Sequence, residues 1–175
     1  TPQLETRAAD ISFVLDQITN HKINGRNDFY QSIKTENVGV FGHSFGGATA
    51  IMASISDDRI KACINLDGWI VPVPEMVVKS GLKKPFLYIG QESWKDTLNY
   101  SKLDRLVQNT KSSKKIIILE HTKHYDFTDI AQIAPVASRL GITGSMNSLD
   151  LKKKLNEEVI IFFDQFIKGE KVKTR

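Results

Sequence analysis

The segment Asn37–Ala50, N-V-G-V-F-G-H-S-F-G-G-A-T-A, constrains the fold more than any other part of the sequence. Val38–Phe41 is an apolar run long enough for one buried strand. Gly42–Gly46 matches the pattern G-x-S-x-G, and Gly47–Ile55 carries small and apolar residues at helical spacing. A strand, a sharp turn and a helix, in that order, predict a serine held at the exposed tip of the turn.

Two features of this turn have chemical consequences. The turn is tight, so the residues two before and two after Ser44 are expected to be small, and both Gly42 and Gly46 meet that requirement. The following helix points its N-terminus at the serine hydroxyl, so the backbone N–H of Phe45 is expected to face a developing negative charge on oxygen. G-x-S-x-G alone is common by chance, and it becomes informative through the predicted strand and helix beside it.

Length and composition favour one globular domain over residues 1–175. The chain is 41% hydrophobic and 25% charged, which is typical of a soluble protein with a sizeable core, and no apolar run approaches the length of a membrane span. The net charge of +4 comes from dispersed lysines without interleaved aromatic residues, which argues against a nucleic-acid site. Cys63 is the only cysteine, so an internal disulfide is excluded and the cellular compartment stays open.

The predicted elements alternate between strands and helices along the chain. Helices are expected at 3–19, 96–110, in part of 127–140, and from an N-cap at Ser148 to a C′ residue at Gly169. Strands are expected at 38–41, 60–66, 85–90 and 115–120. The segment 20–37 is expected to be a loop with a helical turn near Phe29-Tyr30, and 67–74 is expected to be a loop. Because the strands are almost purely apolar, this order predicts an α/β fold with a mostly parallel sheet and helices on both of its faces.

Polar residues with catalytic potential follow the predicted strands, where the carboxyl ends of a parallel sheet meet. A serine hydroxyl needs a base within hydrogen-bond reach and an acid that orients the base. His121 and His124 both follow the last strand, and His124 is favoured because it lies deeper in the loop. The residues leave the acid open between Asp67, after the next strand from the serine, and Glu92, after the strand beyond it. His43 is expected to point away from the serine and to pack.

Three motifs together resemble a known family. G-H-S-F-G-G-A-T at 42–49, I-N-L-D-G-W at 64–69 and H-Y-D-F-T-D at 124–129 are similar to motifs of the plasma-type and type II platelet-activating factor acetylhydrolases, α/β-hydrolases that have bacterial relatives. The resemblance implies Ser44 as nucleophile, Asp67 as acid, His124 as base and the Phe45 N–H as an oxyanion donor. It further implies a small-molecule partner, either a simple carboxylic ester or a phospholipid with a short or oxidised sn-2 acyl chain.

An apolar loop next to the expected triad is a candidate acyl pocket, formed by Trp69, Ile70 and Val71. The resemblance implies hydrolysis without calcium, and we expect neither a cofactor nor a metal. The pair His121-x-x-His124 resembles a pair of metal ligands, but its spacing matches no strong zinc-binding pattern.

The sequence departs from the family's fold before the serine turn. α/β-Hydrolases place several strands there, and a loop among them supplies a second oxyanion N–H, whereas here only one predicted helix precedes Val38. We therefore expect the chain to be the C-terminal part of the fold, with the N-terminal strands on another chain or outside this sequence. The complete set of triad candidates favours an enzyme over a non-catalytic binding module of the same fold, and it does not separate an esterase from a thioesterase or peptidase.

Overall fold

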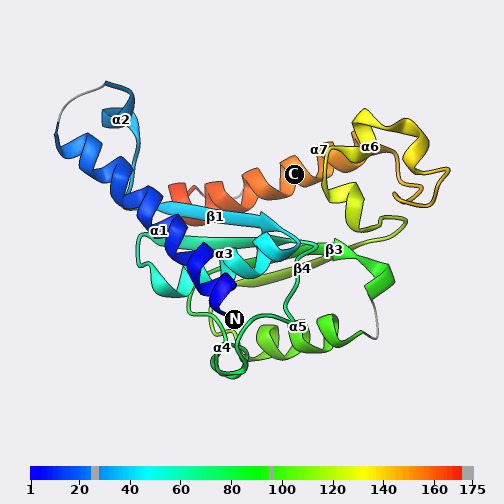
Figure 1. Ribbon diagram of the computed structural model, residues 1–175, viewed down its shortest axis with the longest axis horizontal. Helices are drawn as coiled ribbons and strands as arrows, with labels where there is room; N and C mark the ends of the chain where they lie inside the picture. The colour runs from blue at the N-terminus through cyan, green and yellow to red at the C-terminus, as the bar shows by residue number, and fades with distance from the viewer. Residues whose placement is uncertain (25–27, 95–96, 171–175) are drawn as a thin grey trace.

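The protein is built on a four-stranded, fully parallel sheet (Figure 1). The computed structural model describes residues 1–24, 28–94 and 97–170. The strands lie in the order in which they occur in the chain: β1 (Val38–His43), β2 (Ile60–Leu66), β3 (Phe86–Gln91) and β4 (Lys114–Leu119). β1 forms one edge of the sheet, and among the described residues it pairs only with β2.

The inner strand β3 shows why the sheet is covered on both faces. All six of its residues are buried, and successive side chains point to opposite sides of a strand. Phe86 and Tyr88 join one hydrophobic core, whereas Leu87 and Ile89 join a second. A continuous apolar run, rather than an alternating one, is therefore what this strand needs.

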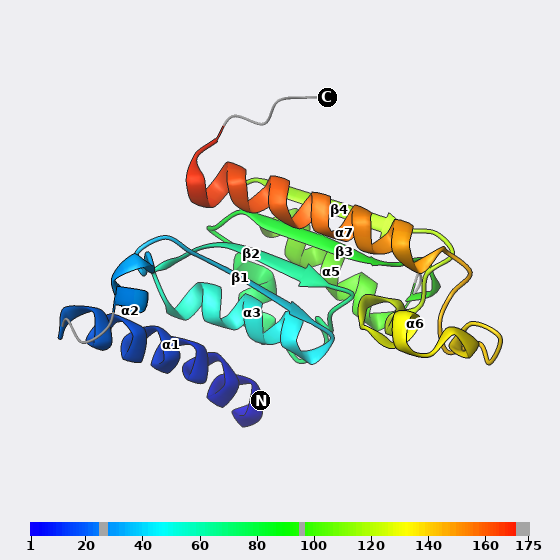
Figure 2. The same cartoon turned by 90° about the horizontal axis from the view of Figure 1, so that it is seen from above.

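Three connecting helices cover the first face: α3 (Phe45–Ser56), α4 (Glu75–Ser80) and α5 (Leu98–Asn109). Parallel strands in chain order are joined by crossovers of one hand, so the connecting helices fall on the same face. The long helix α1 (Pro2–Ile23) packs against α3 and adds Leu4, Ala8 and Leu15 to this core. Figure 2 shows α1 and α3 on one side of the sheet and the C-terminal helix on the other.

Helix α7 (Ser148–Phe163) covers the second face, where Leu151 and Phe162 are buried against the sheet. It continues into a π-helical turn at Asp164–Lys168 and ends at Gly169 with φ 73°, the left-handed residue that the sequence predicts there. The N-cap is Asn147 rather than Ser148. The Asn147 side chain accepts hydrogen bonds from the backbone N–H groups of Leu149 and Asp150, as an N-cap side chain does.

The predicted fold class is confirmed, and the differences concern element ends and connections. A short helix, α2 (Asp28–Ser32), lies where a helical turn is expected near Phe29-Tyr30, within a segment otherwise expected to be a loop; residues 25–27 of that segment lie outside the described residues. The helix expected at 96–110 begins at Leu98, and residue 96 is likewise outside the described part. Short helical turns follow β3 and β4: η1 (Glu92–Trp94), η2 (His124–Phe127), α6 (Ile130–Ile133) and η3 (Pro135–Ala137).

Two further sequence expectations concern Cys63 and the membrane. Cys63 lies fully buried in the first core, and burial raises the pKa of its thiol to about 12, so no reactive thiolate is available there. Within the described ranges, no helix combines the length and the apolar character that crossing a bilayer requires.

Candidate active site

Ser44 occupies a strained turn between β1 and α3. Its backbone has φ 57° and ψ −126°, a conformation that non-glycine residues rarely adopt and that clusters at functional sites. The Ser44 carbonyl accepts hydrogen bonds from the N–H groups of Gly47 at 2.9 Å and Trp69 at 3.0 Å, and its own N–H donates to Leu66 O at 3.2 Å. These bonds tie the turn to the end of β2 and hold the serine side chain at the carboxyl edge of the sheet.

The two glycines of the turn are not equivalent. A Cβ atom at Gly42 would lie 2.2 Å from the carbonyl oxygen of Gly46, so only glycine fits there. A Cβ atom at Gly46 would meet nothing within 4 Å. The expectation that both positions must be small is therefore correct for Gly42 and wrong for Gly46, as far as the described residues are concerned.

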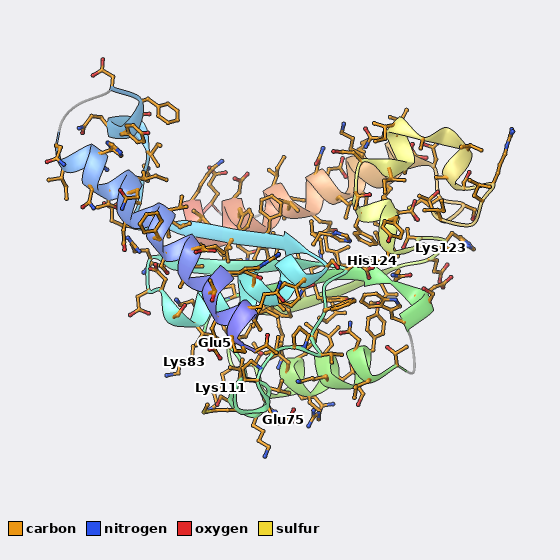
Figure 3. The ribbon with its side chains drawn as sticks, viewed as in Figure 1. Glu5, Glu75, Lys83, Lys111, Lys123 and His124 are labelled. Atoms are coloured by element: carbon orange, nitrogen blue, oxygen red, sulfur yellow. The ribbon has the colours of Figure 1, made fainter. Side chains whose placement is uncertain are left out.

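Three of the sequence-predicted side chains form one hydrogen-bonded chain. His124 Nε2 lies 3.0 Å from Ser44 Oγ, and His124 Nδ1 lies 2.7 Å from Asp67 Oδ2. An ionised carboxylate only accepts, so Nδ1 carries the proton and Nε2 is left to accept from the serine hydroxyl. Figure 3 labels His124 at this edge of the sheet, beside Lys123.

Asp67 follows β2 directly and is completely buried. Its backbone turns with φ 43°, and its N–H donates to Ile89 O at 2.6 Å. Besides His124, the carboxylate accepts two hydrogen bonds from Gln91: the backbone N–H reaches Oδ1 at 3.1 Å, and the side-chain Nε2 reaches Oδ2 at 2.6 Å. Gln91 was not among the sequence candidates, and its only signal is a polar residue at the end of an apolar strand.

The competing candidates Glu92 and His121 lie together and apart from this chain of hydrogen bonds. The His121 N–H is 3.4 Å from Glu92 Oε1, and both residues line a separate, polar cavity of about 620 Å³. The structure thus brings Ser44, His124 and Asp67 together. Among the described residues, neither Glu92 nor His121 forms a hydrogen bond with the side chain of Ser44, His124 or Asp67.

The loop that carries His124 is anchored by a buried carboxylate. Asp126 Oδ2 accepts hydrogen bonds from the backbone N–H of Lys123 at 2.7 Å and of Gly144 at 2.6 Å. The first bond closes the 3₁₀ turn η2, and the second joins it to the segment before α7. These contacts fix the backbone from which the imidazole of His124 extends.

His43 packs against His124, in agreement with the packing role expected for it. Its Nε2 lies 3.2 Å from the carbonyl oxygen of His124, and the two ring centroids are 4.5 Å apart. Burial, and then the neighbouring His124, hold the pKa of His43 below its usual range, so the ring is neutral and donates to that carbonyl. His43, His124 and Asp67 have potential metal-ligand atoms within 4.8 Å of one another, and His43 Nε2 and both ring nitrogens of His124 lie within hydrogen-bond distance of protein atoms.

Phe45 begins α3, so its N–H is one of the helix-terminal donors that have no acceptor inside the helix. Both this placement and the helix dipole suit it to an oxyanion next to Ser44. No second oxyanion donor is assigned within the described residues.

An apolar cavity of about 300 Å³ lies next to residues that contact Ser44 and His124. It is lined by Trp69, Val71, Trp94, Thr97 and Asn99. Trp94 stacks on the imidazole of His124, with centroids 5.1 Å apart. Of the three residues expected in an acyl pocket, Trp69 and Val71 line this cavity, whereas Ile70 is fully buried in the first core and does not.

The wall of this cavity is held by one buried amide. Asn99 Oδ1 accepts from the N–H groups of Ile70 at 2.7 Å and Val71 at 3.3 Å, and its Nδ2 donates to Gly68 O at 3.2 Å. Sequence analysis missed Trp94 and Asn99 because both come from η1 and α5, which follow a different strand from the apolar loop.

Similar solved structures are esterases and hydrolases of the same architecture. A ferulic acid esterase from Streptomyces cinnamoneus matches 98% of this chain with a TM-score of 0.77 and 26% identity, and the chain covers 50% of that structure. A dienelactone hydrolase from Anabaena variabilis matches 91% with a TM-score of 0.56 and 18% identity, which supports the fold alone.

Curated relatives bear names that fit the three motifs. Platelet-activating factor acetylhydrolases from Gallus gallus and Cavia porcellus are 32% and 28% identical over 62% and 78% of the chain. A probable 1-alkyl-2-acetylglycerophosphocholine esterase from Arthroderma benhamiae is 28% identical over 74%. The chain spans 25%, 31% and 32% of the length of these three proteins, respectively.

The family model for platelet-activating factor acetylhydrolase, isoform II, matches residues 6–172, which is nearly the whole chain. The expected resemblance is therefore confirmed: this chain belongs to the isoform II family of platelet-activating factor acetylhydrolases.

Proposed function

We propose that this chain carries the catalytic residues of a serine ester hydrolase that works through an acyl-enzyme. The observation that carries the proposal is the continuous path from Ser44 Oγ to His124 Nε2 at 3.0 Å and from His124 Nδ1 to the buried Asp67 at 2.7 Å. Family membership and the names of the relatives support the same reaction class.

In this proposal Ser44 Oγ attacks the ester carbonyl carbon while His124 Nε2 takes the hydroxyl proton. Asp67 holds the imidazole in the required tautomer and stabilises its cation. The carbonyl oxygen becomes an oxyanion that accepts the Phe45 N–H. The tetrahedral intermediate collapses, and His124 gives its proton to the departing alcohol. Water then attacks the acyl-enzyme with His124 again acting as base, which releases the acid and restores Ser44.

The substrates that we propose are carboxylic esters, including phospholipids with a short or oxidised acyl chain. The names of the relatives support a short chain, since they specify an acetyl group, and the oxidised chain follows from the family resemblance alone. The acyl group would enter the apolar cavity beside Trp69 and Trp94. A water molecule takes about 30 Å³ of the liquid, so a cavity of about 300 Å³ has room for an acyl group several carbons longer than acetyl.

The test combines active-site labelling with a substrate panel, using the protein at its natural length. A fluorophosphonate probe should add once, at Ser44, as located by peptide mapping. Ser44→Ala should abolish labelling and lower ester hydrolysis at least about 10³-fold, because the nucleophile is lost. Ser101→Ala, an exposed serine on α5, is the matched control and should behave as wild type.

Hydrolysis that persists in Ser44→Ala would refute the proposal. A panel of matched esters, thioesters and peptides then separates the esterase from a thioesterase or peptidase that uses the same residues. A folded wild-type protein without labelling or turnover would favour a non-catalytic module.

A further inference from the structure

Gln91 has the most direct contact with the candidate acid of any residue outside the expected triad. It is the last residue of β3, it is 2% exposed, and it donates to both oxygens of the Asp67 carboxylate. Of the three hydrogen bonds recorded to that carboxylate, two come from Gln91 and one from His124.

The orientation of the Gln91 amide is fixed by its own partners. The hydroxyl of Ser93 donates to Gln91 Oε1, and the hydroxyl of Tyr100 donates to the Gln91 carbonyl. Because Oε1 accepts from Ser93, Nε2 faces Asp67. The flipped amide would put two acceptor oxygens 2.6 Å apart, so the donor assignment follows from the network itself.

A buried carboxylate needs such donors to stay charged. Asp67 is 0% exposed, and the only charge partner recorded for it is His124, which is a cation only when protonated. Transfer of an ionised carboxylate out of water is costly unless hydrogen bonds replace the lost hydration. The two N–H groups of Gln91 supply that replacement whether or not His124 is protonated.

The other titratable groups that face Asp67 do not take over this role. His43 is neutral, because burial and His124 hold its pKa below the usual range. Burial also raises the pKa of Tyr100 to about 12 and that of Tyr88 further, so both phenols stay protonated. Neither phenol is recorded as a donor to the carboxylate.

We propose that Gln91 is a positioning residue that supplies the buried Asp67 carboxylate with two N–H donors and aims its Oδ2 at His124. The same oxygen accepts from Gln91 Nε2 at 2.6 Å and from His124 Nδ1 at 2.7 Å, so the amide fixes the atom that orients the base. The inference rests on the proposed function, since the orientation of His124 matters for turnover only if His124 is the base.

The first test compares two substitutions at position 91 with a surface control. Gln91→Met keeps the approximate volume and removes the side-chain donor, so kcat for p-nitrophenyl acetate should fall about 10-fold with KM nearly unchanged, as expected for the loss of a hydrogen bond to a charged group. Gln108→Glu, an exposed residue on α5, should leave both constants at the wild-type value.

Gln91→Glu makes a prediction that a packing role would not. Two carboxyl groups within hydrogen-bond distance share one proton. While the pair holds that proton, one negative charge and one donor remain, as in the wild type. As the pH rises and the proton leaves, the two charges repel and Asp67 is displaced. The variant should therefore lose kcat with rising pH, over a range in which wild type and Gln108→Glu stay level.

A substitution of the acid itself completes the series. Asp67→Asn should lower kcat more strongly than Gln91→Met does, because His124 then loses its charged partner rather than one donor to that partner. Equal losses of kcat in the two variants would contradict a role for Gln91 that acts through Asp67.

A readout without turnover separates this inference from the proposed function. The proton on His124 Nδ1 should give a far-downfield ¹H resonance that moves upfield in Gln91→Met and stays in place in Gln108→Glu. An unmoved resonance, or pH profiles of both Gln91 variants that parallel wild type, would overturn the positioning role. A wild-type protein inactive on esters would refute the proposed function, and the resonance would still decide the role of Gln91.

Discussion

The turn around Ser44 gives a sharp test because its two glycines have opposite surroundings. A Cβ atom at Gly42 would lie 2.2 Å from the Gly46 carbonyl oxygen and 2.4 Å from its carbon, and both are backbone atoms that no side-chain rotation can move. Regaining an ordinary separation of 3.4 Å requires a shift of about 1.2 Å in the turn that carries Ser44. A Cβ atom at Gly46 meets nothing within 4 Å.

The expected magnitudes follow from that shift. In Gly42→Ala, moving Ser44 by about 1 Å breaks its 3.0 Å contact with His124, and a displacement of that size costs about 100-fold in kcat/KM. Overpacking at a backbone contact should also lower the free energy of unfolding by about 1–3 kcal/mol. Gly46→Ala should keep kcat/KM within about threefold of the wild-type value. Its free energy of unfolding should rise by at most about 1 kcal/mol, because alanine has a higher helix propensity than glycine.

The assay measures p-nitrophenyl acetate hydrolysis and urea unfolding for both variants beside wild type. Circular dichroism at the assay temperature shows whether a loss of activity reflects unfolding. Equal activity losses in the two variants, or an active Gly42→Ala, would refute the reasoning from the close approach. The unfolding measurement tests the steric argument even if the ester is a poor substrate.

Two further predictions concern the cavity wall and pH. Asn99→Ala leaves the N–H groups of Ile70 and Val71 without their acceptor, so the free energy of unfolding should fall by about 2–4 kcal/mol. This loss should exceed that of the control Asn109→Ala on the same helix. A loss below about 0.5 kcal/mol for Asn99→Ala in a urea titration would contradict the prediction. His43 has a lowered pKa in the folded protein, so below about pH 6.5 the unfolded state binds a proton that the folded state does not, and stability falls as the pH falls. His43→Asn should therefore show a smaller drop in melting temperature between about pH 7 and pH 5 than wild type, and equal drops would show that His43 is not responsible.

The sheet and the serine turn were predictable because they follow from local patterns. Apolar runs of strand length, separated by helical periodicity, suffice to predict parallel strands with covered faces. The motif around Ser44 predicts the exposed hydroxyl once a strand and a helix flank it. These features depend on residues close together in the sequence, so the fold class could be predicted from the sequence, and the structure confirms it.

The choice between Asp67 and Glu92 needed more than the pattern of residues. Both follow a strand at the same edge of the sheet, so strand order alone treats them alike. In the structure the difference lies in side-chain direction: Asp67 turns inward with φ 43° and is buried under His124, whereas Glu92 begins the exposed turn η1. Only the family resemblance favoured Asp67 before the structure was considered.

The residues that sequence analysis missed act across strands. Gln91 reaches Asp67 from the neighbouring strand, and Asn99 reaches back to the loop after β2 from helix α5. Such contacts depend on how segments far apart in the sequence align in the fold, and the hydrophobic periodicity of a single segment does not predict that alignment. Ile70 lies in the first core rather than along the cavity, and the apolar composition of the loop does not reveal which of its side chains turns into the core.

The agreement between strand order and chain order has a consequence for synthesis on the ribosome. Each strand can pair with the one made just before it, so β1, β2 and β3 can align while the rest of the chain is still being translated. His124 emerges only after β4, and the helix that covers the second face of the sheet emerges later still. The nascent chain therefore presents Ser44 and Asp67 before it presents a base, and ester hydrolysis by the proposed route cannot begin until the loop after β4 that carries His124 has emerged.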